Sequence, residues 1–176
     1  MLPFAHTGLT VAAAIIVNRH RKPRAESPKL PNVRFLYLAL FALLPDIVDH
    51  PLGVFIIPQF HTHHLIAHSL LFSACLLLLI LLVRPSKVAY GLACMGHLVL
   101  DHMWDSPHTF LFPFLGLTFD SSGRVIYTFS EYLIDIPARL ISSPTIWIGE
   151  IIGLAILVSV FFLGKGRLSN LNIRYP

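Results

Sequence analysis

Charged residues are scarce in this chain, and their scarcity argues against a soluble globular fold. Only 12% of the 176 residues are charged and 55% are apolar, whereas soluble domains usually carry roughly 25% charged residues. The two cysteines fall inside apolar stretches and define no disulfide framework. The sequence also lacks a glycine-rich phosphate loop and a Gly-x-Ser-x-Gly elbow, which disfavours nucleotide-dependent enzymes and serine hydrolases.

Five apolar stretches follow one another along the chain. Two of them approach the ~20 residues needed to cross a hydrocarbon core, and three shorter ones have His or Asp near one end. We therefore predict an all-α fold, a polytopic membrane bundle of about five transmembrane helices at residues 2–17, 35–48, 65–83, 88–104 and 146–162. No internal repeat is found, so residues 1–176 are expected to form a single domain. The first stretch lacks a preceding basic segment, and we expect it to be retained rather than cleaved as a secretory signal.

Basic residues predict the orientation of this bundle. Most of the 13 Lys and Arg residues lie at 18–34, 84–87 and 165–174, on one predicted side. The positive-inside rule makes that side cytoplasmic, with the N-terminus outside and the C-terminus inside. The outer connection 105–145 is apolar, and its pieces 110–117 and 132–141 are expected to lie in the interface or fold over the bundle. Aromatic residues do not interleave with the basic ones, so we expect contact with membrane lipids and not with nucleic acid.

Histidine is abundant, and nearly all of it gathers on the predicted outer side. Of the ten histidines, His20 alone falls in the basic connection. Residues three or four apart on a helix share a face, as in the pairs Asp46 with Asp49, His64 with His68, and His97 with Asp101. Taken singly, each is compatible with an ordinary polar helix end, but the whole set on one side favours a metal site.

A mixed imidazole and carboxylate set suits a divalent ion, zinc first and manganese or iron as alternatives. The candidate ligands are His6, Asp46, Asp49, His63, His68, His97 and Asp101. More than four ligands favours more than one ion. His64 and Asp105 are the candidate general acid or base, or outer partners that orient the ligands.

This site predicts a membrane-bound, metal-dependent hydrolase that uses activated water. Its position near the headgroups favours a lipid or lipid-linked ester, especially a phosphoester, as substrate. Two alternatives stay open. The same side chains are compatible with transport of a divalent metal or protons, although transporters place such residues at mid-membrane and often carry repeats. The other alternative is a non-catalytic partner protein in which the metal only holds the helix ends together.

These motifs resemble those of the YdjM-type family of inner-membrane proteins, described as metal-dependent hydrolases and as LexA-binding. The family pattern begins with an early His and Gly, followed by Pro-Asp-x-x-Asp, a His-Arg-x-x-Thr-His-Ser string, and His-x-x-x-Asp ahead of Pro-Phe. The matching positions, over the N-terminal two thirds, are His6 and Gly8, Pro45 to Asp49, His63 to Ser69, His97 to Asp101, and Pro113 with Phe114. The resemblance implies a prokaryotic inner membrane.

The chain departs from that pattern at two positions. His64 stands where the family has Arg, and Ala67 stands where it has Thr. Because Arg binds phosphate bidentately, its replacement bears on the substrate class more than on the metal site. The family is also similar, more distantly, to the all-helical zinc phospholipase C and P1 nuclease group, which implies phosphoester chemistry on a multi-zinc site.

Overall fold

The computed structural model describes residues 3–20, 33–60, 62–121, 143–167 and 173–174, together with 130, 134, 137 and 141; at 18–20, 33, 58, 145, 163–167 and 173–174 it describes the backbone alone. The helices are α1 (Pro3–His20), α2 (Phe35–Ala42), α3 (Leu44–Pro51), α4 (Leu70–Val83), α5 (Val88–Leu100), α6 (Pro107–Phe110) and α8 (Pro144–Arg167). Short helical turns occupy Leu52–Ile56, Pro58–Phe60, Ile66–His68, Pro85–Lys87 and Met103–Asp105. Two-residue strands, β1 (Val33–Arg34) and β2 (Ile173–Arg174), pair in parallel. The predicted all-α class is confirmed, with this short pairing as an addition.

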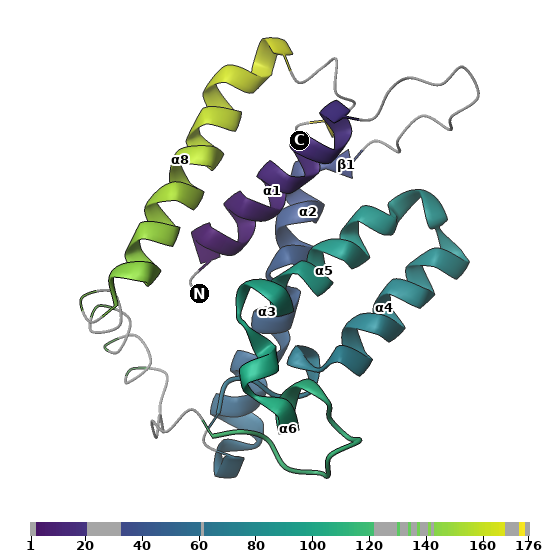
Figure 1. Cartoon of the computed structure of the whole chain (residues 1–176), viewed down its shortest axis with the longest axis vertical. Helices are drawn as coiled ribbons and strands as arrows, with labels where there is room; N and C mark the ends of the chain where they lie inside the picture. Colours follow the sequence, from purple (N-terminus) through teal and green to yellow (C-terminus); the bar gives the residue numbers. More distant parts are fainter. Residues whose placement is uncertain are drawn as a thin grey trace.

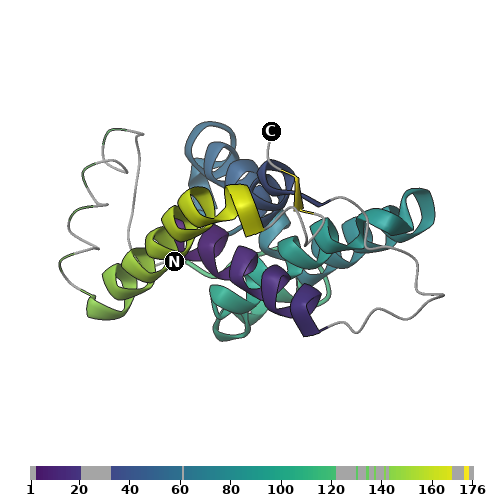
Figure 2. The same ribbon diagram turned by 90° about the horizontal axis from the view of Figure 1, so that it is seen from above.

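The long helices pack in an order that differs from their order in the chain. Contacts run from α8 to α1, from α1 to α2, from α2 to α5, and from α5 to α4 (Figure 1). Seen from above, α8 and α1 lie side by side, and the α4–α5 hairpin lies on the other side of the molecule (Figure 2). Val11 of α1, Leu38 and Ala42 of α2, Ala93 of α5 and Val160 of α8 meet in one buried apolar cluster.

Glycine allows α1 and α8 to approach each other closely. A Cβ added at Gly8 would lie 2.4 Å from the Gly153 carbonyl oxygen, and one added at Gly153 would lie 2.1 Å from the Phe4 carbonyl oxygen. No side chain fits in either place without moving a backbone. The two helices run parallel, because Ala5 packs near Gly149 and Gly8 near Gly153.

A break divides the second predicted span. Leu43 falls between α2 and α3, Pro45 lies in the first turn of α3, and the two halves meet at 46°. Proline has no N–H to continue the hydrogen bonding of a preceding helix, so a new helix starts there. The break leaves Asp46 in the first turn of α3 and Asp49 one turn further on.

All five predicted apolar stretches are helical; α1 and α8 extend beyond the first and fifth stretches, whereas the helices in the three stretches between them are shorter than predicted. The third stretch becomes a helical turn at Ile66–His68 followed by α4 from Leu70, and in the fourth α5 ends at Leu100. Among the described residues, no single helix combines the length and apolarity needed to cross a membrane; α2 together with Leu44–Ile56 does so as a bent pair. The five-span bundle therefore stays a prediction.

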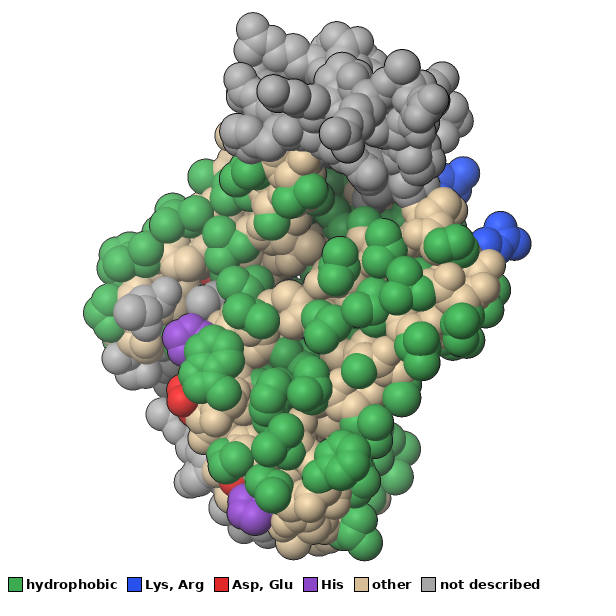
Figure 3. Space-filling model, turned by 45° about the vertical axis from the view of Figure 1, so that its right-hand side comes forward, with side chains coloured by type: hydrophobic (Ala, Val, Ile, Leu, Met, Phe, Trp, Pro, Cys, Tyr) green, Lys and Arg blue, Asp and Glu red, His purple; other side chains and the backbone are tan. Residues whose placement is uncertain are grey.

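The described basic side chains lie at one end of the helices, and His and acidic side chains gather at the other. Of the basic side chains that the structure describes, Arg34 precedes α2, Arg84 follows α4 and Lys87 precedes α5. Basic atoms lie at the upper right of the space-filling view, and His and acidic atoms at its left and lower margin (Figure 3). Most of the basic connection 18–34, and most of the interfacial piece predicted at 132–141, lie outside the described residues.

Candidate metal centre

Four side chains from three separate segments converge at the end of the bundle away from the described basic residues. Asp46 comes from α3, His68 from the turn before α4, His97 from the last turn of α5, and Asp101 from the position directly after α5. One ligand atom from each lies within 4.8 Å of all the others. Sequence spacing had paired His97 with Asp101, and the fold adds the other two.

The distances between these atoms are short and similar. His68 Nε2 lies 3.2 Å from His97 Nε2 and 3.4 Å from Asp46 Oδ1. His97 Nε2 lies 3.6 Å from Asp46 Oδ1 and 3.2 Å from Asp101 Oδ2. Both imidazoles are fully buried, and Asp101 is nearly so. Two carboxylates and two imidazoles thus share a small, mostly dry volume.

The hydrogen bond made by Nδ1 of each imidazole determines whether Nε2 has a lone pair for a metal. His97 Nδ1 lies 2.7 Å from the Ala42 carbonyl oxygen, which can only accept, so Nδ1 must carry the proton. His68 Nδ1 lies 2.7 Å from Asp49 Oδ2 and donates in the same way. In the neutral rings both Nε2 atoms then hold lone pairs, and these point toward each other and toward carboxylate oxygens.

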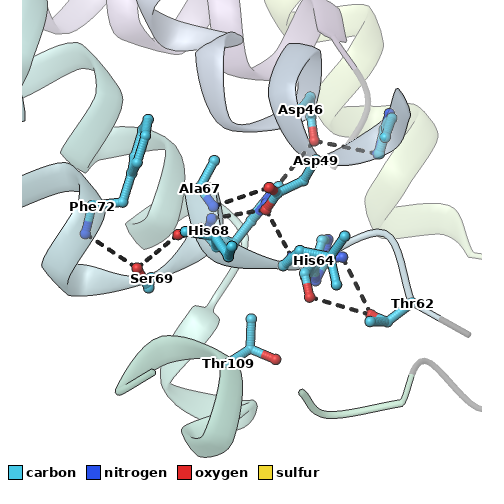
Figure 4. Close-up of polar contacts among 12 residues, drawn as sticks. Asp46, Asp49, Thr62, His64, Ala67, His68, Ser69, Phe72 and Thr109 are labelled. Carbon is cyan, nitrogen blue, oxygen red and sulfur yellow. Dashed lines mark hydrogen bonds and ion pairs between the residues drawn. The ribbon is translucent and has the colours of Figure 1, made fainter. Parts of the chain in front are cut away.

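Asp49 holds the turn that carries His68. Its carboxylate accepts hydrogen bonds from the backbone N–H groups of Leu65 (2.7 Å), Ala67 (2.9 Å) and His68 (3.0 Å), as well as from the His68 ring. Figure 4 shows Asp49 directed at this turn. The side chain is completely buried. Asp49 therefore faces Nδ1 of His68, on the side of the ring away from the four-residue group.

His6 contacts the group through Asp101. Its Nε2 lies 3.1 Å from Asp101 Oδ1 without good hydrogen-bond geometry, and its ring stacks on His97 with centroids 4.0 Å apart. The ring is fully buried. Asp101 therefore presents one oxygen to His6 and the other to His97 and His68.

The other predicted site residues lie further out. The His64 ring stacks on His68 with centroids 4.3 Å apart, and His63 is buried with its ring against His50. His50 Nε2 lies 3.5 Å from Asp46 Oδ1, a contact that the motif analysis did not select although the two residues are one helical turn apart. Asp105 is exposed at the end of the turn Met103–Asp105. The structure does not bring Asp49, His63, His64 or Asp105 into the four-atom group.

Burial sets the protonation of His64, which lies in the connection ahead of α4. Burial, followed by the nearby His68 charge, lowers the pKa of His64 to about 3, so this ring is neutral at physiological pH. The His68 ring has Asp46 at Nε2 and Asp49 at Nδ1, so a proton and a metal ion would compete for the same Nε2 atom.

The fold brings together residues from the four sequence motifs: His6, Asp46, His68, His97 and Asp101. In a comparison of the whole chain with protein families, the YdjM inner membrane protein family matches residues 1–168. The chain belongs to this family. Its membership extends the likeness seen in the motifs from the N-terminal two thirds to almost the whole chain, and the family's name assigns it to an inner membrane.

No curated protein and no solved structure matches the chain. The more distant likeness to the zinc phospholipase C and P1 nuclease group is therefore not shown. The YdjM family supports membrane association, and the His/Asp group supports a metal site whose ion is not identified.

Proposed function

We propose that this YdjM-family protein is a membrane-bound, metal-dependent hydrolase with its metal held by Asp46, His68, His97 and Asp101. One observation carries the proposal: four acceptor atoms, two imidazole Nε2 and two carboxylate oxygens, face one another within 4.8 Å, while both Nδ1 protons are committed elsewhere. Such a group is repulsive unless a cation lies within it.

The donor set fits a divalent metal ion. Bonds of ~2.0–2.1 Å to nitrogen and oxygen, as for zinc, place tetrahedral ligand atoms about 3.3–3.4 Å apart. Five of the six separations among the four atoms are 3.2 to 3.8 Å, a range that brackets this value closely. Zinc is our first choice, and manganese or iron also accept this mixture of imidazole and carboxylate.

The chain's own groups give the site its chemistry. Asp49 and the Ala42 carbonyl hold the two imidazoles with Nε2 inward, and the pairing with carboxylate raises ligand basicity. A bound ion would supply Lewis acidity to water and to a substrate oxygen. His64 lies over His68 as a neutral ring, suited to orient substrate by hydrogen bonding, and exposed Asp105 is the candidate for proton transfer.

The surroundings favour a lipid or lipid-linked ester, especially a phosphoester, as substrate. The segment after α5 packs on the His68 turn through α6. Thr109 and Asp120 brace its loop with two reciprocal hydrogen bonds of 3.0 and 2.9 Å. That loop exposes Phe114 (76%) and Leu117 (74%), side chains suited to insert among acyl chains beside the site.

Membrane embedding of the whole bundle is part of the proposal. Apolar side chains cover much of the face in Figure 3, and Leu82, Val83 and Phe162 are among the most exposed large ones. A soluble monomer rarely exposes so much contiguous apolar surface. We propose five spans with the site at the outer face, the N-terminus outside and the C-terminus in the cytoplasm.

The test is metal content combined with turnover in detergent-purified protein. We expect about one zinc, manganese or iron ion per chain by elemental analysis, or more if further ions bind, and hydrolysis of at least one lipid phosphoester class. The substitution Asp101→Asn, which keeps size but removes the charge, should lose both. His108→Ala, at an exposed position, is the matched control and should keep both.

Three results are informative. Folded wild type that takes up none of these ions would reject the metal centre. Metal without turnover of any lipid ester would reject the lipid-ester hydrolase and leave the transporter and the metal-stabilised partner protein. Loss of metal in both variants would point to unfolding rather than to loss of a ligand.

A further inference from the structure

Glu150 is buried in α8, and it caps a helix to which it is not connected in sequence. The first N–H groups of any helix lack acceptors within the helix. In α1 two of them find the Glu150 carboxylate: Phe4 N donates to Oε2 at 3.0 Å and Ala5 N donates to Oε1 at 2.9 Å. Each oxygen of one side chain therefore serves one backbone group of the other helix.

The position of Glu150 is tightly constrained. It lies between Gly149, whose Cβ position is 3.6 Å from Ala5 Cβ, and Gly153, which admits no side chain against Phe4. Glu150 itself is 9% exposed. The carboxylate also lies at the positive end of the α1 dipole, a favourable place for an acidic side chain. The contact thus sets both the closeness of the helices and the register of α1 along α8.

The backbone group that Glu150 binds is only one residue away from a side chain of the metal centre. His6 follows Ala5 directly, and its imidazole lies 3.1 Å from Asp101 Oδ1 and stacks on His97. Both neighbours of His6 in the site belong to the proposed ligand set. The position of the first turn of α1 therefore decides where the His6 ring lies.

We propose that Glu150 is a positioning residue, which fixes the first turn of α1 and thereby holds His6 against Asp101 at the metal centre. The part of this that concerns metal rests on the proposed function. A side chain on α8, which supplies none of the four proposed ligands, would then influence metal affinity through His6 alone.

The first experiment needs no metal. In metal-free protein, diethyl pyrocarbonate labels accessible imidazoles, and peptide mass spectrometry reports the rate at His6. Glu150→Gln replaces one acceptor oxygen by an amide donor that faces an N–H group, so we expect His6 to react several-fold faster. Val160→Ala trims the same α1–α8 interface within the apolar cluster and should leave His6 labelling unchanged.

The second experiment is a double-mutant cycle on Co²⁺ affinity. Outer-shell substitutions typically weaken metal binding 10–100-fold, and we expect about a 10-fold loss from Glu150→Gln. In a His6→Ala background the same substitution should cost nothing further, because the coupling runs through His6. If Glu150→Gln does not fold, Glu150→Asp, which shortens the side chain but keeps the charge, replaces it in both experiments.

The outcomes separate the two proposals. Unchanged His6 labelling, or an equal loss of Co²⁺ affinity with and without His6, would overturn the positioning role and leave the metal centre intact. Wild type that fails to bind Co²⁺ would overturn the metal centre and the metal half of this inference, while the labelling rate still decides whether Glu150 positions His6.

Discussion

The two ends of this helix bundle treat polar side chains in opposite ways. At one end, Arg34 and Arg84 are exposed, and the charges of Arg34 and Lys87 each lie 5.8 Å from a tyrosine ring centroid. At the other end, His68, His97 and Asp49 are completely buried and contact one another or the backbone at short range.

The difference in burial between the two ends has an energetic consequence. Exposed cations beside tyrosine are typical of a membrane interface, where they remain hydrated and contribute little to folding. Buried carboxylates and imidazoles are costly unless each is paired, so the second end fits the proposed metal centre better than an ordinary polar surface. Substitutions at the two ends should therefore have very different effects.

Asp49→Ala should have the largest effect. It would leave the N–H groups of Leu65, Ala67 and His68 without their acceptor in a buried place, at a cost of about 3–5 kcal/mol in unfolding free energy. Denaturant unfolding in detergent measures this. Asp49→Asn keeps one acceptor oxygen and should fold, with metal affinity lowered about 10–100-fold. An Asp49→Ala protein as stable as wild type would mean that the turn carrying His68 is stable without the Asp49 carboxylate.

His97→Ala should remove the metal while sparing most of the fold. The ring supplies one of four proposed ligands and stacks on His6, so bound metal should fall from about one ion per chain to near zero by elemental analysis. The cavity should also lower stability by about 2–4 kcal/mol. A variant that keeps its metal would show that Asp46, His68 and Asp101 suffice, and that the buried end is less interdependent than we infer.

Metal affinity should depend on pH with a defined sign. A protonated His68 Nε2 has no lone pair for a ligand bond, so a proton and an ion compete for the same atom. As long as the ring is protonated an ion must displace the proton, so the affinity for Zn²⁺ should rise about tenfold per pH unit and level off once the ring is neutral. Chelator competition at several pH values tests this. A flat profile would indicate that His68 is neutral without metal.

Arg84→Ala should have the smallest effect. The side chain is exposed beyond the end of α4, so its loss should change unfolding free energy by no more than about 0.5 kcal/mol and leave metal content unchanged. The same two assays measure both. A large loss of metal on this substitution would break the contrast between the two ends and require coupling along α4.

Particular residues show how far sequence reasoning reaches. Spacing placed His97 and Asp101 on one helix face, and both join the four-atom group. The same argument treated Asp46 and Asp49 as equals, because they too are three residues apart. The structure separates them: Asp46 faces His68 Nε2, whereas Asp49 binds the turn and His68 Nδ1. Spacing predicts a shared face and carries no information on which segment later in the chain will cover it.

The sequence alone determined that the chain is helical, apolar and divided into five stretches, and that its His and Asp residues gather at their shared ends, since these properties follow from composition and from distances along one chain. The tertiary structure decided which side chains meet. It brought Asp46 to His68, the Ala42 carbonyl to His97, and Glu150 to the first turn of α1, across 145 residues. Such contacts depend on helix packing, close approach at glycine and the break before Pro45, and a local pattern does not contain them.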